Sequence, residues 1–239
     1  LIFRLHSGES VAKGRSKCPK CQHALRAIDL IPVLSFIFLR GKCRYCHAPI
    51  SRQYPAVELV TGALFVLVYQ FLIPSAGRGE VGGLIYLVYL WFVVSVAILV
   101  FVYDLKHYLI LDVVIYPALA VTLVVVLFLP QYDFWRALIG SGVVGGFFLI
   151  LVLLSRETWM GWGDVKLGFW LGLALGWPLC LPLLLIAFVG GSVVVLLLMW
   201  LKLKGWKDAV PFGTMLTAAA VATLLVGQKL IDWYLGLLG

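Results

Sequence analysis

The sequence predicts an all-α polytopic membrane protein. We expect a bundle of about eight transmembrane helices, the first truncated here, with a small cytoplasmic loop domain that binds zinc through four cysteines. Of the 239 residues, 63% are hydrophobic and 13% are charged, whereas soluble domains carry roughly 25% charged residues. Uncharged stretches recur at lengths close to the roughly 20 residues that cross a bilayer. The domain boundary is expected between residues 1–55 and 56–239.

The transmembrane helices are expected in uncharged stretches of the chain, which are 59–72, 83–103, 113–132, 137–155 and 209–228. A further uncharged run, 167–201, is too long for one helix. The segment GWPLCLP divides it into two, because proline removes a helical donor and glycine loosens the backbone. The chain opens with LIFRLHSG and no Met. We interpret this opening as the tail of a truncated or processed first transmembrane helix.

Positive charge predicts the orientation. Ten of the 19 Lys and Arg lie in residues 1–55. If this segment is inside and the helices alternate, 16 basic residues fall inside and three outside, which the positive-inside rule favours. The net charge of +8 is then explained by anionic lipid headgroups, and nucleic acid is not expected as a partner.

The basic segment contains two Cys-x-x-Cys pairs, in KCPKCQ and KCRYCH. Their spacing is typical of a tetrahedral metal site with four thiolate ligands, Cys18, Cys21, Cys43 and Cys46. The predicted cytoplasmic location is reducing, so zinc is a better interpretation than disulfides.

Two acidic residues lie at the ends of apolar helices, where a charge is costly and usually functional. Asp104 ends one stretch and Asp164 opens another, both at the predicted cytoplasmic edge. Paired carboxyl groups cannot both ionise readily, so they can share one proton. One can then activate a water while the other, protonated, polarises a carbonyl, which is aspartic-protease chemistry. Seen alone, Asp104 could instead be a solvated loop charge and Asp164 a helix cap.

Asp112 competes as a partner for Asp104. It lies eight residues further on, about 12 Å along a continuous helix and about 80° around it, so we expect it to cap the next helix instead. Gly161 and Gly163 allow close backbone approach beside Asp164. Lys166 is expected either to extend to the membrane interface or to tune the acidic pair.

The segments YDLKHYLILD, MGWGDVKLG and VPFGTML together resemble the type IV prepilin peptidase family of GxGD intramembrane aspartic proteases. The cysteine segment, through QYPAVELVTG, resembles the amino-terminal domain of its bacterial members. The order of these segments in one chain is very specific. Departures from the common pattern are Leu30 for asparagine, Lys106 for an acid, Leu111 for proline and Thr214 for proline.

The resemblance implies a multi-pass enzyme of the bacterial inner membrane, with its active site facing the cytoplasm. It implies removal of the basic leader of type IV prepilins or pseudopilins, including those of type II secretion. N-methylation of the new amino terminus with S-adenosylmethionine would follow. The catalytic pair matches Asp104 and Asp164, and the cysteines hold structural zinc, since four thiolates leave no position open for water. Glu58 is either a contact for methyl transfer or the substrate amine, or a first-turn carboxylate favoured by the helix dipole.

Three alternatives use the same residues. A membrane transporter with a regulatory zinc domain would place acids near the bilayer midplane. A thiol redox protein would need exposed thiolates on a non-cytoplasmic side. A methyltransferase without peptidase activity would differ from a bifunctional enzyme only in failing to cleave the prepilin.

Overall fold

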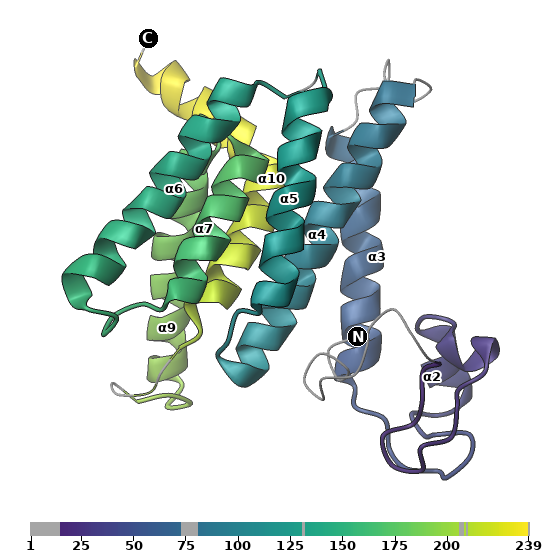
Figure 1. The fold of residues 1–239 in the computed structure, drawn as a ribbon. Coiled ribbons are helices and arrows are strands. Elements are labelled where there is room, and N and C mark those ends of the chain that lie inside the picture. The colour runs from purple at the N-terminus through teal and green to yellow at the C-terminus, as the bar shows by residue number, and fades with distance from the viewer. Residues whose placement is uncertain (1–14, 73–80, 131, 206–207, 209, 239) are drawn as a thin grey trace. The chain divides into compact units, whose positions relative to one another are not determined.

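The computed structural model describes residues 15–72, 81–130, 132–205, 208 and 210–238. The chain forms two compact units, 1–66 and 67–239. Within the described ranges all regular elements are helical, apart from two isolated β-bridges (Figure 1). The predicted end of a truncated first helix falls in residues 1–14, outside the described part of the chain.

The first unit contains two cysteine turns with the same hydrogen-bond pattern. The amide of Cys18 donates to the carbonyl of His23 at 3.0 Å, and the amide of Cys43 donates to that of Ala48 at 2.9 Å. The chain then reverses through a left-handed residue after each pair, Gln22 (φ 57°) and His47 (φ 53°). Between the turns lie a short 3-10 helix, η1 (Ala27–Leu30), and a short helix, α2 (Leu34–Phe38). The apolar helix α3 (Gln53–Leu72) follows them and crosses the boundary between the two units.

The second unit is a helical bundle. Its elements are α4 (Val81–His107), α5 (Asp112–Phe128), α6 (Phe134–Ser155), α7 (Trp162–Leu175), α8 (Cys180–Leu185), the π-helix η3 (Ile186–Gly190), α9 (Gly191–Trp200) and α10 (Phe212–Leu238). The predicted division of the long apolar run is confirmed, because α7 ends at Leu175 and Gly176 adopts φ 68° before α8 begins. Cys180 is fully buried at the start of α8 and packs as a small apolar side chain.

Helix α7 lies at the centre of the bundle and packs on α6, α5 and α10. Its Trp170 is completely buried, and the indole N–H donates to the hydroxyl of Thr122 on α5 at 3.0 Å. The contact with α6 is close because Gly140 and Gly172 face each other, where a Cβ on either would clash with the backbone of the other helix.

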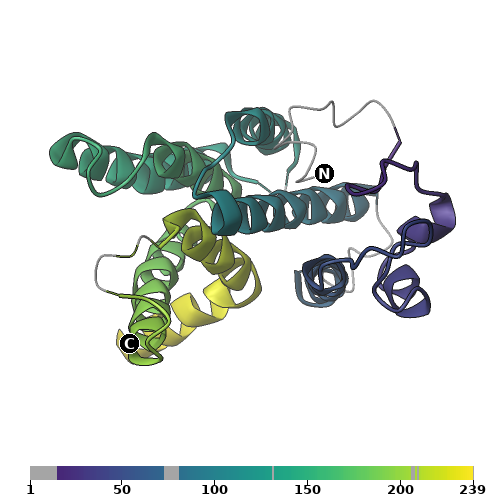
Figure 2. The same ribbon diagram turned by 90° about the horizontal axis from the view of Figure 1, so that it is seen from below.

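Five helices among the described residues are long and apolar enough to cross a membrane. They include α3, α4, α6 and α10, together with the continuous segment Cys180–Trp200. Helices α5 (17 residues) and α7 (14 residues) are shorter than the roughly 20 residues that cross a bilayer. Helix α7 is covered by its neighbours, so protein replaces lipid around much of it. Figure 2 shows α4 between α5 and α10, with which it packs; this arrangement brings the carboxyl end of α4 to the amino end of α10.

Candidate functional site

Asp104 lies in the last turn of α4 and is 4% exposed. Its Oδ2 accepts a 2.8 Å hydrogen bond from the backbone N–H of Thr214. The alternative of a solvated loop charge is therefore wrong for Asp104. A carboxyl group taken out of water at the end of a membrane helix is instead typical of a functional site.

The amino end of α10 provides the surroundings of Asp104. Gly213 is in the first turn of α10, and a Cβ at this position would lie 2.7 Å from Oδ2 of Asp104. Only glycine therefore leaves room for the carboxyl group. The free N–H groups at a helix start also favour negative charge. No role for Gly213 or for the Thr214 amide was predicted from the sequence; the glycine in VPFGTML is the signal that could have indicated this close approach.

Asp164 is the third residue of α7, and its carboxylate accepts a 3.3 Å hydrogen bond from the backbone N–H of Gly161. Gly161 is the residue that precedes the helix. Asp164 therefore does satisfy a free amide at the helix start, as a capping residue does. One carboxylate oxygen can accept this bond while the other is left for further chemistry.

A single side chain, Ile110, links the surroundings of the two aspartates. A Cβ at Gly163 would lie 3.0 Å from Ile110 Cβ, and a Cβ at Gly213 would lie 3.0 Å from Ile110 Cδ1. Ile110 thus packs against the glycine before Asp164 and the glycine beside Asp104. The structure brings Asp104 and Asp164 to one end of the bundle, and no sequence signal had indicated Ile110.

Asp112 and Lys166 form an ion pair of 2.7 Å. Asp112 is in the first turn of α5, but Leu111 is the residue that precedes the helix, and the Asp112 carboxylate is bound by Lys166. The predicted helix cap is therefore wrong. The Lys166 ammonium also lies 5.4 Å from the centre of the Tyr116 ring. Lys166 thus joins the starts of α7 and α5 beside the aspartates.

The four predicted metal ligands converge. The sulfur atoms of Cys18, Cys21, Cys43 and Cys46 lie within 4.8 Å of one another, and those of Cys18 and Cys46 are 3.9 Å apart. A tetrahedral zinc ion with Zn–S bonds of about 2.3 Å requires sulfur atoms about 3.8 Å apart, so the cluster fits a metal ion.

The thiols differ in acidity. The backbone N–H of Cys21 lowers the pKa of Cys18 to about 7. At Cys46 the backbone N–H of Ala48 favours the thiolate, but burial and the neighbouring thiols outweigh it and raise the pKa to about 11. Four thiolates this close repel one another, so their joint ionisation needs a cation between them.

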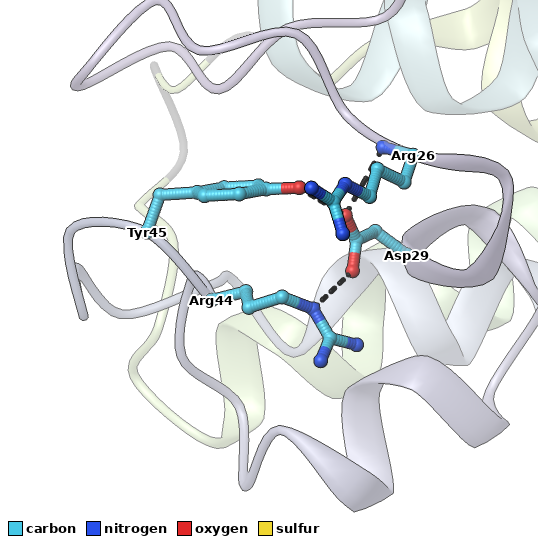
Figure 3. Close-up of polar contacts among 4 residues, drawn as sticks. All are labelled: Arg26, Asp29, Arg44 and Tyr45. Carbon is cyan, nitrogen blue, oxygen red and sulfur yellow. Dashed lines mark hydrogen bonds and ion pairs between the residues drawn. The ribbon is translucent and has the colours of Figure 1, made fainter.

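Asp29 connects the middle of the cysteine segment to the second cysteine turn through hydrogen bonds (Figure 3). Its side chain is 3% exposed. It accepts hydrogen bonds from Arg44 Nε at 2.7 Å, from the Tyr45 hydroxyl at 3.1 Å and from the Arg26 amide at 3.1 Å. Burial opposes ionisation, but these donors outweigh it and lower the pKa of Asp29. Arg44 and Tyr45 stand between Cys43 and Cys46, so Asp29 holds the backbone that presents these ligands.

Glu58 lies in the second turn of α3, because the helix begins at Gln53. The interpretation as a first-turn carboxylate is therefore wrong. Its Oε2 accepts a 2.8 Å hydrogen bond from the backbone N–H of Val33. Val33 has φ 61°, an unusual conformation for a β-branched residue, and this bond helps to hold it.

Comparisons with known proteins agree with these observations. The family model described as the bacterial peptidase A24 N-terminal domain matches residues 1–72. The model of the type IV leader peptidase family matches residues 91–196, which include both aspartates. No solved structure matches the chain significantly.

Curated relatives carry the name prepilin leader peptidase/N-methyltransferase. One from Burkholderia pseudomallei is 35% identical over 218 residues, which cover 89% of this chain and 67% of the relative. One from Aeromonas hydrophila is 35% identical over 225 residues, covering 92% and 74%. One from Legionella pneumophila is 31% identical over 230 residues, covering 93% and 76%. The match favours an enzyme over the transporter alternative. The chain therefore belongs to the type IV leader peptidase family, a family of proteases.

Proposed function

We propose that Asp104 and Asp164 are the catalytic pair of a membrane-embedded aspartic endopeptidase. The observation that carries this proposal is the buried carboxyl group of Asp104 at the start of α10, with Ile110 packed against both Gly213 beside it and Gly163 next to Asp164. Two such groups hold one proton between them, because two adjacent negative charges repel. The ionised member takes a proton from water as it attacks the peptide carbonyl. The protonated member donates a hydrogen bond to the carbonyl oxygen as it becomes negative.

The proposed substrate is a type IV prepilin or pseudopilin. Its short basic leader would be removed at the cytoplasmic face, at the boundary with its apolar helix. The relatives' shared name supports this substrate class, and the charge asymmetry of the sequence supports the orientation. A leader that is positively charged would be attracted to acids at the same membrane edge.

The second proposed step is N-methylation of the new amino terminus with S-adenosylmethionine. The match of residues 1–72 to the bacterial N-terminal domain, together with the relatives' name, supports it. Within this domain, Cys18, Cys21, Cys43 and Cys46 would hold zinc. With four thiolate ligands the ion has no position left for water, so its contribution is to the fold of the cysteine segment.

The direct experiment incubates the purified enzyme with a prepilin and follows loss of the leader by mass spectrometry. Asp104→Asn and Asp164→Asn should abolish cleavage. Asp112→Asn is the matched control, because this acid is at the same end of the bundle but paired with Lys166, and it should retain activity. Cleavage at the normal rate by either Asp104→Asn or Asp164→Asn contradicts the assignment. Adding S-adenosylmethionine should then add one methyl group to the product.

A further inference from the structure

Helix α2 exposes an apolar stripe. Leu34, Ile37 and Phe38 are 51%, 60% and 80% exposed, and their spacing of three and four residues places them on one side of the helix. Phe36 points the other way, since its ring packs where a Cβ of Gly41 would lie. The ring of Phe36 thus packs partly within the small unit, whereas three large apolar side chains point outward. Such a contiguous apolar surface usually marks an interaction site.

The depth of α2 relative to the membrane is set by α3. Val33 immediately precedes α2, and its N–H is bound to Glu58 at 2.8 Å. Glu58 lies five residues into α3, about 8 Å from its first residue at 1.5 Å per residue. The uncharged part of α3 starts directly after it, at Leu59. Helix α2 is therefore held at the level where α3 passes from the headgroups into the hydrocarbon.

Positive charge borders the apolar stripe. Phe38, Arg40, Lys42 and Arg44 line an open hollow of about 340 Å³. The apolar ring of Phe38 thus shares one surface with three cations. This combination is typical of segments that lie on an anionic bilayer, with apolar side chains among the acyl chains and Lys or Arg at the phosphates.

We propose that Leu34, Ile37, Phe38, Arg40 and Lys42 form a membrane-docking patch that binds anionic phospholipid of the adjoining leaflet. The apolar side chains would enter the boundary of the acyl region, and the two cations would contact headgroup phosphates. Anionic phospholipid is the expected ligand because the patch combines apolar and cationic groups at the level of the membrane interface. The inference depends on α3 crossing the membrane and not on the proposed catalytic pair.

The test uses the full chain in nanodiscs that contain equal amounts of phosphatidylglycerol and phosphatidylcholine with identical acyl chains. The photocrosslinker p-benzoylphenylalanine replaces Phe38, and the adducts are identified by mass spectrometry. We expect lipid adducts enriched in phosphatidylglycerol. In the background of Arg40→Gln and Lys42→Gln, this enrichment should fall by roughly threefold or more, since each cation near the surface contributes to anionic lipid binding. The same probe at Phe36 is the matched control and should crosslink to peptide within the cysteine segment.

A second measurement uses the unsubstituted chain. Backbone amides of residues 34–38 should exchange hydrogen more slowly in phosphatidylglycerol nanodiscs than in phosphatidylcholine nanodiscs, and Arg40→Gln with Lys42→Gln should remove the difference. Adducts at Phe38 with residues 67–239, with a prepilin or with a second copy of the chain would overturn the proposal. So would lipid adducts in the same ratio as the bilayer composition together with identical exchange in both lipids.

Discussion

The backbone N–H of Thr214 donates a 2.8 Å hydrogen bond to Asp104 Oδ2, joining residues 110 positions apart in the sequence. The approach is close enough that a Cβ at the neighbouring Gly213 would lie 2.7 Å from the same oxygen. Gly213 is therefore the position at which the proposed pair is most sensitive to added volume.

Gly213→Ala should displace the carboxyl group of Asp104 and slow leader removal by about fivefold or more, because inserting a methyl group into a packed site costs about 1–3 kcal/mol. The measurement is the initial rate of prepilin cleavage. Gly142→Ala is the matched control, since a Cβ there meets nothing within 4 Å. Equal rates in the two variants would contradict the close approach.

The Lys166–Asp112 ion pair should contribute little to cleavage. Its side chains are 27% and 54% exposed, and ion pairs in contact with water contribute about 1 kcal/mol or less. Lys166→Gln and Asp112→Asn should each lower thermal stability slightly, and their combination should cost no more than either alone. A loss of cleavage as large as that of Asp104→Asn would instead place Asp112 in the catalytic pair.

The cysteine cluster should depend on metal. Cys18→Ser, or treatment with a strong zinc chelator, should remove protection from hydrogen exchange in residues 15–50, because metal binding contributes folding free energy. Metal analysis should find one zinc ion per chain. Cys180→Ser is the control, since this buried cysteine lies in α8 of the other unit. A well-protected cysteine segment without bound metal would refute the zinc assignment.

Asp29 should stabilise the second cysteine turn in a manner that depends on pH. Its pKa is lowered in the folded unit, so its contribution is fully present above the unfolded value of about 3.9 and is lost as pH falls through the folded value. Asp29→Asn should weaken protection of residues 43–46 at neutral pH by about 1–2 kcal/mol, the usual effect of removing a hydrogen-bonded charge. The ratio of exchange rates between variant and wild type should shrink below about pH 4. A ratio of one at neutral pH would show that the contacts of Asp29 contribute nothing.

Composition and motif order predicted the helical membrane fold, the break after Leu175 and the convergence of the four cysteines. These features depend on local signals, namely apolar length, glycine and proline, and ligand spacing. The lengths of α5 and α7 were not predictable in the same way. An apolar run of residues shows that a segment avoids water, but not whether lipid or protein surrounds it.

The sequence also did not predict which groups bind the individual carboxylates. Asp112 was expected to cap α5, but Lys166 from α7, 54 residues away, binds it. One of the two alternatives for Glu58 was a first-turn carboxylate, but α3 starts earlier and the backbone N–H of Val33 binds Glu58. Such contacts are set by tertiary packing, which brings together segments whose spacing carries no periodic signal.

The central claim is that Asp104 and Asp164 act as one unit. The measurement that tests it most directly is the rate of leader cleavage in a double-mutant cycle of Asp104→Asn and Asp164→Asn, with Asp112→Asn as an independent third site. Residues of one catalytic unit are strongly non-additive. We therefore predict that each single variant loses cleavage almost completely, that the double variant is no slower, and that Asp112→Asn changes little. Losses from Asp104→Asn and Asp164→Asn that multiply, or substantial cleavage by either single variant, would contradict the account.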